Sequence, residues 1–316
     1  MHWTILGAGA IGCLWAAHLQ RAGASVSLVL RSPERLAQFR QRGGIKLIDD
    51  SGETFCPLNA TLAATPQSIA QLLLCTKAYD SQRALESVWH RLNADSHILV
   101  LQNGMGSQQQ VIERAGNDRV LIGSTTDGAY MRAPFEVVHA GRGETAIGRF
   151  YSTDASLPDF GPKFGLQLRQ DPAIETTLWR KLAINCAINP LTALYGCRNG
   201  ELATVPAYSH ALEALCKEFE AVAQACNIPL FEGPLHEQAL MVARATANNY
   251  SSMLQDIRHQ RPTEIEQITG FLCNQAQLAG IDVPRNRAAL QQVRQLQRNS
   301  GKASDLCSES PNSPSS

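Results

Sequence analysis

Residues 3–30, WTILGAGAIGCLWAAHLQRAGASVSLVL, decide the fold of this chain. A short apolar strand leads into GAGAIG, a helical pattern follows and ends at a glycine, and ASVSLVL predicts a second strand. In such a unit the glycines let the backbone approach a pyrophosphate, and the helix start offers unpaired N–H groups. The complete unit favours this function over a glycine turn that serves packing alone. It predicts a Rossmann-type domain with a cofactor-binding glycine turn that contains Gly7, Gly9 and Gly12.

The residue after the second strand indicates which nicotinamide cofactor binds. NAD-binding proteins commonly carry an acid there, which binds the ribose 2′-hydroxyl. This chain has Arg31, and the first acid after it is Glu34. A guanidinium suits a 2′-phosphate through charge-assisted hydrogen bonds, so Arg31 predicts NADPH rather than NADH. The alternative is a solvated arginine at a strand end.

Two later strand ends also carry polar groups. LLLCT leads into Lys77, and ILVLQ leads into Asn103. Ligands of open α/β sheets bind beyond the carboxyl ends of the strands, so both side chains are expected near the cofactor. Strand-like segments at 119–123, 135–139 and 144–150 are expected to continue the same sheet. Between them, Gly128 and Ala129 are expected to pass close to the cofactor.

Composition excludes several classes of function. The 316 residues are 44% hydrophobic, 18% charged and carry no net charge, which argues against nucleic acid or a membrane surface as partner. We expect no signal peptide and no membrane span. The nine cysteines have neither disulfide nor zinc spacing, so we expect no metal, reduced thiols and a cytoplasmic protein.

Strand patterns give way to helical periodicity near Pro172. We therefore expect a doubly wound α/β domain over 1–170, an all-α domain over 171–299 and a Ser/Pro-rich disordered tail over 300–316. Helices are predicted at the following ranges: 173–194, 206–226, 234–248, 262–279 and 284–298.

The most informative helical segment is residues 179–190, WRKLAINCAINP. Lys181, Asn185 and Asn189 are spaced by four and therefore share one helix face. Apolar neighbours are expected to depress the pKa of Lys181 by desolvation, which makes it a candidate proton donor near neutral pH. A surface lysine whose stem covers apolar neighbours is the alternative.

Two further segments are ambiguous by themselves. Ser252 and Asp256 lie four apart, and Thr263 and Glu266 have the spacing of a capping box at a helix start. Glu264 then falls in the first turn, where complementarity to the helix dipole is a sufficient explanation. The segment CRNGEL at 197–202 is equally consistent with a plain turn.

Four blocks in order are similar to the ketopantoate reductase (2-dehydropantoate 2-reductase) family. They are ILGAGAIGCLWA, QNGMG, LWRKLAINCAINPLTALYGCRNGEL and SSMLQDIRHQRPTEIEQITGFL. The resemblance spans residues 1 to about 298 and implies a helical second domain like the C-terminal domain of 6-phosphogluconate dehydrogenase. It also implies NADPH-dependent reduction of ketopantoate to (R)-pantoate, on the route to pantothenate and coenzyme A. Gln102 departs from the family pattern and is expected to matter little.

The resemblance assigns roles that residue reasoning leaves open. Lys181 corresponds to the general acid, and Glu264 to the catalytic glutamate that orients the substrate and the developing hydroxyl. The substrate positions correspond to Asn103, Asn185, Asn189, Asn199 and Ser252. The cofactor positions correspond to Arg31, Lys77, Asn103, Ala129 and Glu264, and to all six residues of the glycine turn: Gly7, Ala8, Gly9, Ala10, Ile11 and Gly12.

Two other functions stay open at this point. One is a related reductase of another 2-keto or 3-keto acid, and the other is an NADPH-binding sensor or scaffold. The intact set of Lys181, Asn185 and Glu264 disfavours the sensor. We expect a small-molecule substrate and a monomer or homodimer, and the sequence leaves regulation and any role of the tail open.

Overall fold

The computed structural model describes residues 2–152 and 164–308, with side chains described up to residue 299. Two compact units, 1–177 and 178–316, divide the chain inside helix α5 (Ile174–Tyr195). We expected this boundary at 170/171, where the composition changes, but the first turn of α5 belongs to the first unit. Helix α11 (Pro284–Ser308) continues past residue 299, where we expected the tail to begin. The rest of the expected tail, 309–316, lies outside the described residues.

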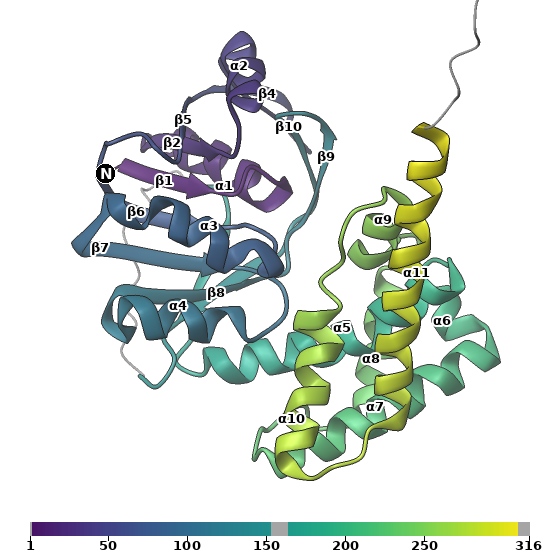
Figure 1. The fold of residues 1–316 in the computed structure, drawn as a ribbon. Coiled ribbons are helices and arrows are strands. Elements are labelled where there is room, and N and C mark those ends of the chain that lie inside the picture. Colours follow the sequence, from purple (N-terminus) through teal and green to yellow (C-terminus); the bar gives the residue numbers. More distant parts are fainter. Residues whose placement is uncertain (1, 153–163, 309–316) are drawn as a thin grey trace, which may run out of the picture. The chain divides into compact units, whose positions relative to one another are not determined.

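An eight-stranded sheet organises the first unit, in the order β12-β11-β8-β7-β6-β1-β2-β5. Its strands from β5 to β8 are all parallel, in the order of a doubly wound dinucleotide-binding sheet. Figure 1 shows helices α3 and α4 lying over β6, β7 and β8. The predicted Rossmann-type sheet is confirmed. Its elements are β1 (His2–Leu6), α1 (Ala10–Arg21), β2 (Ser25–Leu30), α2 (Pro33–Arg42), β5 (Asn59–Leu62), β6 (Ile69–Leu74), η1 (Ala78–Asp80), α3 (Ser81–Val88), η2 (Trp89–Arg91), β7 (Leu92–Leu101), α4 (Ser107–Ala115), η3 (Asn117–Arg119), β8 (Val120–Thr125), β11 (Glu144–Gly148) and β12 (Gln167–Gln170).

A second sheet of four strands packs on α1, in the order β4-β3-β10-β9. It consists of β3 (Gly44–Asp49), β4 (Gly52–Pro57), β9 (Gly128–Ala133) and β10 (Glu136–Gly141). The expectation that 135–139 continues the main sheet is therefore wrong, whereas β8 and β11 do continue it. The physical reason is burial: Phe135 and Val137 pack into the same core as Trp15 and Leu19 of α1. Helix α1 is consequently buried from Gly12 to Leu19.

The second unit is helical, as predicted. Its elements are the main part of α5, α6 (Glu201–Thr204), α7 (Pro206–Ala225), α8 (Leu235–Ala245), α9 (Ser252–Arg258), the π-helical turn η4 (Glu266–Gly270), α10 (Phe271–Ala279) and α11. Helix α7 contacts α6, α8, α10 and α11, which makes it the central helix of this unit. Trp179 of α5 packs edge-on against Phe219 of α7 and Phe271 of α10.

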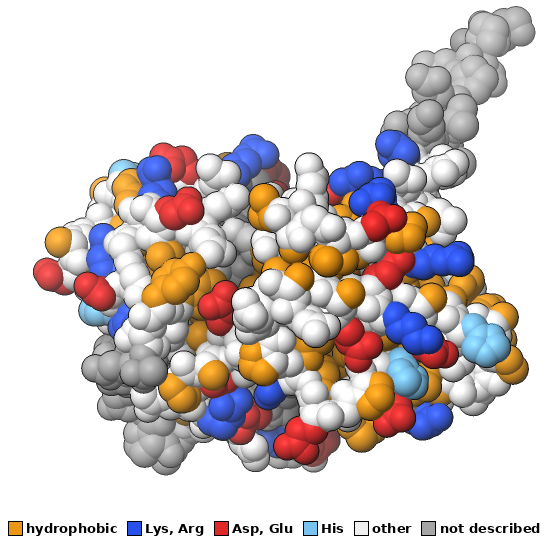
Figure 2. Space-filling view, turned by 90° about the horizontal axis from the view of Figure 1, so that it is seen from below, with side chains coloured by type: hydrophobic (Ala, Val, Ile, Leu, Met, Phe, Trp, Pro, Cys, Tyr) orange, Lys and Arg blue, Asp and Glu red, His pale blue; other side chains and the backbone are white. Residues whose placement is uncertain are grey.

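The surface of each unit is mixed in charge. On the face drawn in Figure 2, Lys and Arg side chains lie among Asp and Glu side chains. Among the described residues, none of the helices combines the length and apolar character that crossing a bilayer requires.

Candidate functional site

The glycine turn lies at the switch point of the main sheet, between β1 and β6. Gly7 has a φ of +117°, and a Cβ there would lie 2.6 Å from the backbone carbon of Cys75. A Cβ on Gly12 would lie 1.9 Å from the carbonyl oxygen of Gly7. Gly7 and Gly12 therefore allow the turn to close against itself and against β6.

Gly9 differs from the other two glycines because a Cβ there would meet no atom within 4 Å. It is the N-cap of α1, its backbone is extended, and no side chain caps this helix end. The first turn of α1 carries no acid. Unpaired N–H groups, the helix dipole and open space beside Gly9 fit a pyrophosphate.

Arg31 follows β2 directly and is exposed. The next residue, Ser32, caps α2 by accepting a hydrogen bond from the N–H of Arg35. The start of α2 thus fixes the backbone beside Arg31 at the carboxyl end of β2. This is the sheet edge at which the ribose of a dinucleotide is expected.

Lys77 and Asn103 follow β6 and β7 at the same edge, and a residue between these strand ends joins them. Gln102 is buried, and its amide nitrogen donates to the carbonyl oxygen of Thr76 (3.0 Å). Its amide oxygen accepts from the hydroxyl of Ser107 at the start of α4 (3.0 Å). Gln102 therefore fixes the backbone next to both predicted cofactor contacts. Sequence reasoning gave it little weight because Thr76 and Ser107 become its partners only in the folded sheet.

Ala129 lies in β9, in the strand that leaves the carboxyl end of β8. Its register partner across β9 and β10 is His139. Neither residue belongs to the main sheet, so the predicted contact at Ala129 is held by the second sheet.

Lys181 lies on α5 and is half-buried among apolar neighbours. Desolvation lowers the pKa of its ammonium to about 8, and the nearby charge of Glu264 opposes this shift. A lysine with this pKa is largely protonated at neutral pH and releases its proton readily. Lys181 and Glu264 therefore share one electrostatic environment.

Glu264 is 5% exposed, and the residues on either side of it are fastened to α11. Thr263 donates its N–H and its hydroxyl to the side-chain oxygen of Gln297 (3.0 and 2.9 Å). Glu266 forms an ion pair with Arg294. The expected capping box between Thr263 and Glu266 is therefore wrong, because the Thr263 hydroxyl accepts from the N–H of Ile265 (3.4 Å) and the Glu266 carboxylate pairs with Arg294 of α11. The π-helical turn η4 that follows is a feature frequent at functional sites.

The amide residues are held on connected segments of the second unit. Asn185 is half-buried and Asn189 is buried on α5. Three residues after Asn189, Thr192 hydrogen-bonds the hydroxyl of Ser251, which caps α9 (2.7 Å). This bond ties α5 to the start of α9, where Ser252 is exposed.

Asn199 is buried in the turn before α6, and its amide nitrogen donates to the hydroxyl of Thr246 (2.9 Å). Its side-chain oxygen is also buried and accepts no hydrogen bond from any residue that the structure describes. A buried acceptor of this kind is costly unless a ligand or water satisfies it. This is the physical observation that favours a ligand-binding role for Asn199.

An arginine–tyrosine–arginine stack, which sequence reasoning missed, fastens the segment between α8 and α9. Arg198 and Arg258 both stack on the ring of Tyr250, at 4.8 and 4.0 Å. Arg198 also donates to the carbonyl oxygen of Asn248, and Arg258 to that of Gly196. Because Arg198 lies about fifty residues before Tyr250 and Arg258, no local motif marks the stack. It holds Asn199 and Ser252 on joined segments.

Asp256 lies on the same helix as Ser252, but the two side chains have different environments. It is buried and forms an ion pair with Arg261 (3.0 Å), whereas Ser252 is exposed. Asp256 therefore has a structural partner of its own. Within the part of the chain whose side chains are described, no three His, Cys, Asp or Glu residues are grouped to hold a metal ion.

Comparison with protein families gives matches over both units. The model described as ketopantoate reductase PanE/ApbA matches residues 3–152, and the model of its C-terminal domain matches residues 173–297. The Vibrio cholerae protein named 2-dehydropantoate 2-reductase is 36% identical over 308 residues, which cover 96% of this chain and 100% of the relative. The Escherichia coli O157:H7 protein of the same name is 35% identical, over 92% of this chain and 93% of the relative.

Solved structures show the same architecture. A PanE/ApbA family ketopantoate reductase from Ralstonia eutropha superposes with a TM-score of 0.86 at 27% identity, over 95% of this chain and 99% of that one. A D-mandelate dehydrogenase solved with NADH and anilino(oxo)acetate superposes with a TM-score of 0.87 at 22% identity, over the same shares. At that identity the second likeness is one of fold.

Proposed function

Because the chain belongs to the ketopantoate reductase PanE/ApbA family, we propose that it reduces 2-dehydropantoate to (R)-pantoate with NADPH. Relatives named 2-dehydropantoate 2-reductase cover nearly the whole chain. The single observation that carries the chemistry is Lys181, a half-buried ammonium whose pKa is lowered to about 8.

Lys181 acts as the general acid. Reduction of a 2-keto acid builds negative charge on the carbonyl oxygen, and a positioned ammonium both stabilises that charge and donates the proton. A pKa of about 8 leaves most of the group protonated at neutral pH and makes transfer easier than from an exposed lysine near 10.5.

Glu264 and the amide residues orient the substrate. The Glu264 carboxylate accepts a hydrogen bond from a substrate hydroxyl and limits the fall in the pKa of Lys181. Asn185, Asn189 and Asn199, with Ser252, bind the carboxylate and hydroxyl groups without adding a competing cation. The buried, unpartnered oxygen of Asn199 supports its part in this set.

The cofactor, when bound, supplies the hydride. In this chain the N–H groups at the start of α1 hold the pyrophosphate, and Arg31 binds the 2′-phosphate that distinguishes NADPH from NADH. Lys77, Asn103 and Ala129 follow β6, β7 and β8 and would line the other half of the dinucleotide.

We place this reaction in the cytoplasm. The described cysteines are all free thiols, which supports a reducing compartment.

The test is NADPH oxidation by the purified protein, followed by absorbance with ketopantoate as substrate. NADH and a series of other 2-keto and 3-keto acids are assayed in parallel. Rapid oxidation that requires both NADPH and ketopantoate is the expected result, with (R)-pantoate identified as product.

Two outcomes contradict the proposal in different ways. Turnover of another keto acid without turnover of ketopantoate assigns the chain to a related reductase and places the error in the substrate pocket. NADPH binding without turnover of any keto acid assigns it a sensor or scaffold role.

A further inference from the structure

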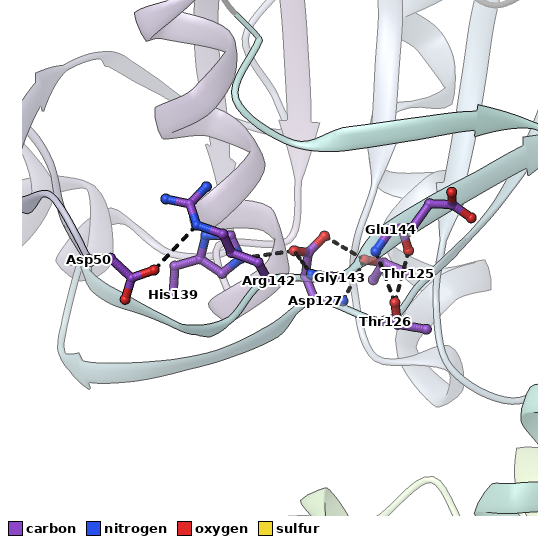
Figure 3. Close-up of polar contacts among 8 residues, drawn as sticks. All are labelled: Asp50, Thr125, Thr126, Asp127, His139, Arg142, Gly143 and Glu144. Carbon is purple, nitrogen blue, oxygen red and sulfur yellow. Dashed lines mark hydrogen bonds and ion pairs between the residues drawn. The ribbon is translucent and has the colours of Figure 1, made fainter. Parts of the chain in front are cut away.

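The first unit contains a buried acid–histidine pair that the proposed reaction does not use. The Nε2 atom of His139 in β10 lies 2.8 Å from a carboxylate oxygen of Asp127. Their side chains are only 2% and 1% exposed. Figure 3 shows Asp127 between His139 on one side and Thr125 and Thr126 on the other.

The Asp127 carboxylate interacts with three other residues. Besides His139, it accepts hydrogen bonds from the backbone N–H of Gly143 (2.9 Å) and the hydroxyl of Thr125 (3.0 Å). Burying a carboxylate is unfavourable unless several donors compensate it, and breaking such a set leaves an unpaired buried charge. These three donors come from β8, β10 and the turn before β11, so one carboxylate joins three segments.

The segment that carries Asp127 is also bonded to Glu144, the residue that follows Gly143. Thr126 donates its N–H to the carbonyl oxygen of Glu144, and the N–H of Glu144 donates to the Thr126 hydroxyl (both 2.9 Å). Gly143 must be glycine for this approach, because a Cβ there would lie 2.4 Å from the carbonyl carbon of Thr126. Residues 125–127 therefore have little freedom to move.

The pair brackets the predicted cofactor contact Ala129. Asp127 precedes Ala129 by two residues, and His139 is the register partner of Ala129 across β9 and β10. This segment leaves the carboxyl end of β8, beyond the switch point, in the half of the sheet opposite the ribose site at β2. We propose that Asp127 and His139 are positioning residues that hold the backbone at Ala129 against the nicotinamide half of the cofactor.

His18 of α1 completes the surroundings of the pair. Its ring packs edge-on against His139, with centroids 5.8 Å apart. Desolvation, followed by the proximity of His139, lowers the pKa of His18 to about 4. His18 is therefore neutral at physiological pH and adds no positive charge beside His139. It also links the pair to the helix that begins at the glycine turn.

This inference rests on the proposed dinucleotide binding, so its test measures NADPH binding without any keto acid. NADPH fluorescence titrations compare the intact protein with His139→Leu and His139→Gln. We expect His139→Leu to raise the Kd for NADPH about fivefold or more. Glutamine, which keeps an N–H donor, should restore most of the affinity. In turnover assays the KM for NADPH should rise in His139→Leu while the KM for the keto acid stays unchanged.

Ser96→Ala is the matched control. Ser96 of β7 is fully buried, and its hydroxyl donates to the carbonyl oxygen of Ile69 (2.6 Å), the first residue of β6 in the eight-stranded sheet and therefore away from the carboxyl ends of the strands. It should lower the melting temperature without changing the Kd for NADPH. The proposal is overturned if folded His139→Leu binds NADPH like the intact protein, or if Ser96→Ala weakens binding equally.

Two fallback variants keep the test decisive if His139→Leu does not fold. Asp127→Asn removes the charge but preserves size, and it should weaken NADPH binding while His139→Gln does not. Unchanged affinity in Asp127→Asn overturns the proposal. Failure of the intact protein to reduce ketopantoate would contradict the proposed function and leave this binding test unaffected.

Discussion

The two units prepare their candidate sites in opposite ways. In the first unit the predicted ligand contacts are mostly backbone groups at strand ends. Glycine is required there because a side chain would clash: at Gly12 a single Cβ would lie 1.9 Å from a carbonyl oxygen. In the second unit the contacts are side chains, and Lys181 is adjusted by burial until its pKa falls to about 8. In the proposed function, the first unit leaves space beside Gly9 for an anion, whereas the second unit desolvates the Lys181 ammonium that we propose as the proton donor.

The difference determines what a substitution should do in each unit. A substitution in the glycine turn adds atoms to the backbone turn. Depending on the position, it should lower the stability of the unit, its affinity for the cofactor, or both. A substitution at Lys181 removes a chemical group from α5, a helix that is already stabilised by its buried apolar residues. The catalytic rate should therefore fall far more than the stability of the unit. Each prediction below uses this contrast.

The largest effect is expected from Lys181→Ala. Loss of a general acid typically costs about 10²-fold to 10⁴-fold in rate, so kcat should fall by at least about 10²-fold. The KM for NADPH should change little, because Lys181 is not among the predicted cofactor contacts. Steady-state kinetics with ketopantoate measure both values. An unchanged kcat would remove Lys181 from the mechanism.

The pH dependence of kcat tests the same assignment. The proton donor is the ammonium form, so kcat should fall as the pH rises through about 8. Lys181→Arg keeps a cation that stays protonated above that range, so its residual activity should lack this alkaline limb. Lys217→Ala is the control, because Lys217 is an exposed lysine of the same unit paired with Glu213 (2.7 Å). It should leave both kcat and the pH profile unchanged.

The second largest effect is expected from the glycine turn, where two neighbouring glycines should behave differently. Gly12→Ala should destabilise the first unit by about 3 kcal/mol, the upper range for overpacking, because its Cβ meets backbone that cannot move aside. Gly9→Ala meets no atom within 4 Å and should leave the melting temperature unchanged while weakening NADPH binding. Calorimetry and fluorescence titration separate the two quantities. Equal loss of stability in both variants would contradict the distinction.

The contrast between the units also explains what could be predicted from sequence. The first strand, the glycine turn and α1 are contiguous, so their local pattern is sufficient, and the long apolar helix α5 is recognisable for the same reason. The roles of Glu264 and Asn199 came from the family resemblance rather than from their own segments. In the structure their surroundings come from α11 and from the segment before α9, far along the chain.

Three expectations depended on partners that sequence periodicity does not reveal. The second sheet pairs β3 with β10, which lies about ninety residues later in the chain. The alternating pattern of β10 is that of any half-buried strand, so it does not indicate which sheet the strand joins. Glu266 has the spacing of a capping residue, yet its carboxylate pairs with Arg294 on α11. Gln102 departs from the family pattern, yet it joins the ends of β6 and β7. Sequence spacing predicts which elements form, whereas tertiary contacts decide which polar groups meet.

The smallest effect is expected from Arg31→Ala, which tests the first unit through a side chain rather than through its backbone. Arg31 is exposed, so its bond to a 2′-phosphate is partly screened, and its loss should raise the KM for NADPH by about tenfold. The KM for NADH should stay the same, so the preference between the two cofactors should narrow. Arg40→Ala is the matched control, because Arg40 is an exposed arginine of the neighbouring helix α2. If the preference for NADPH survives in Arg31→Ala, cofactor choice in this unit depends on backbone geometry alone, as its binding of the pyrophosphate does.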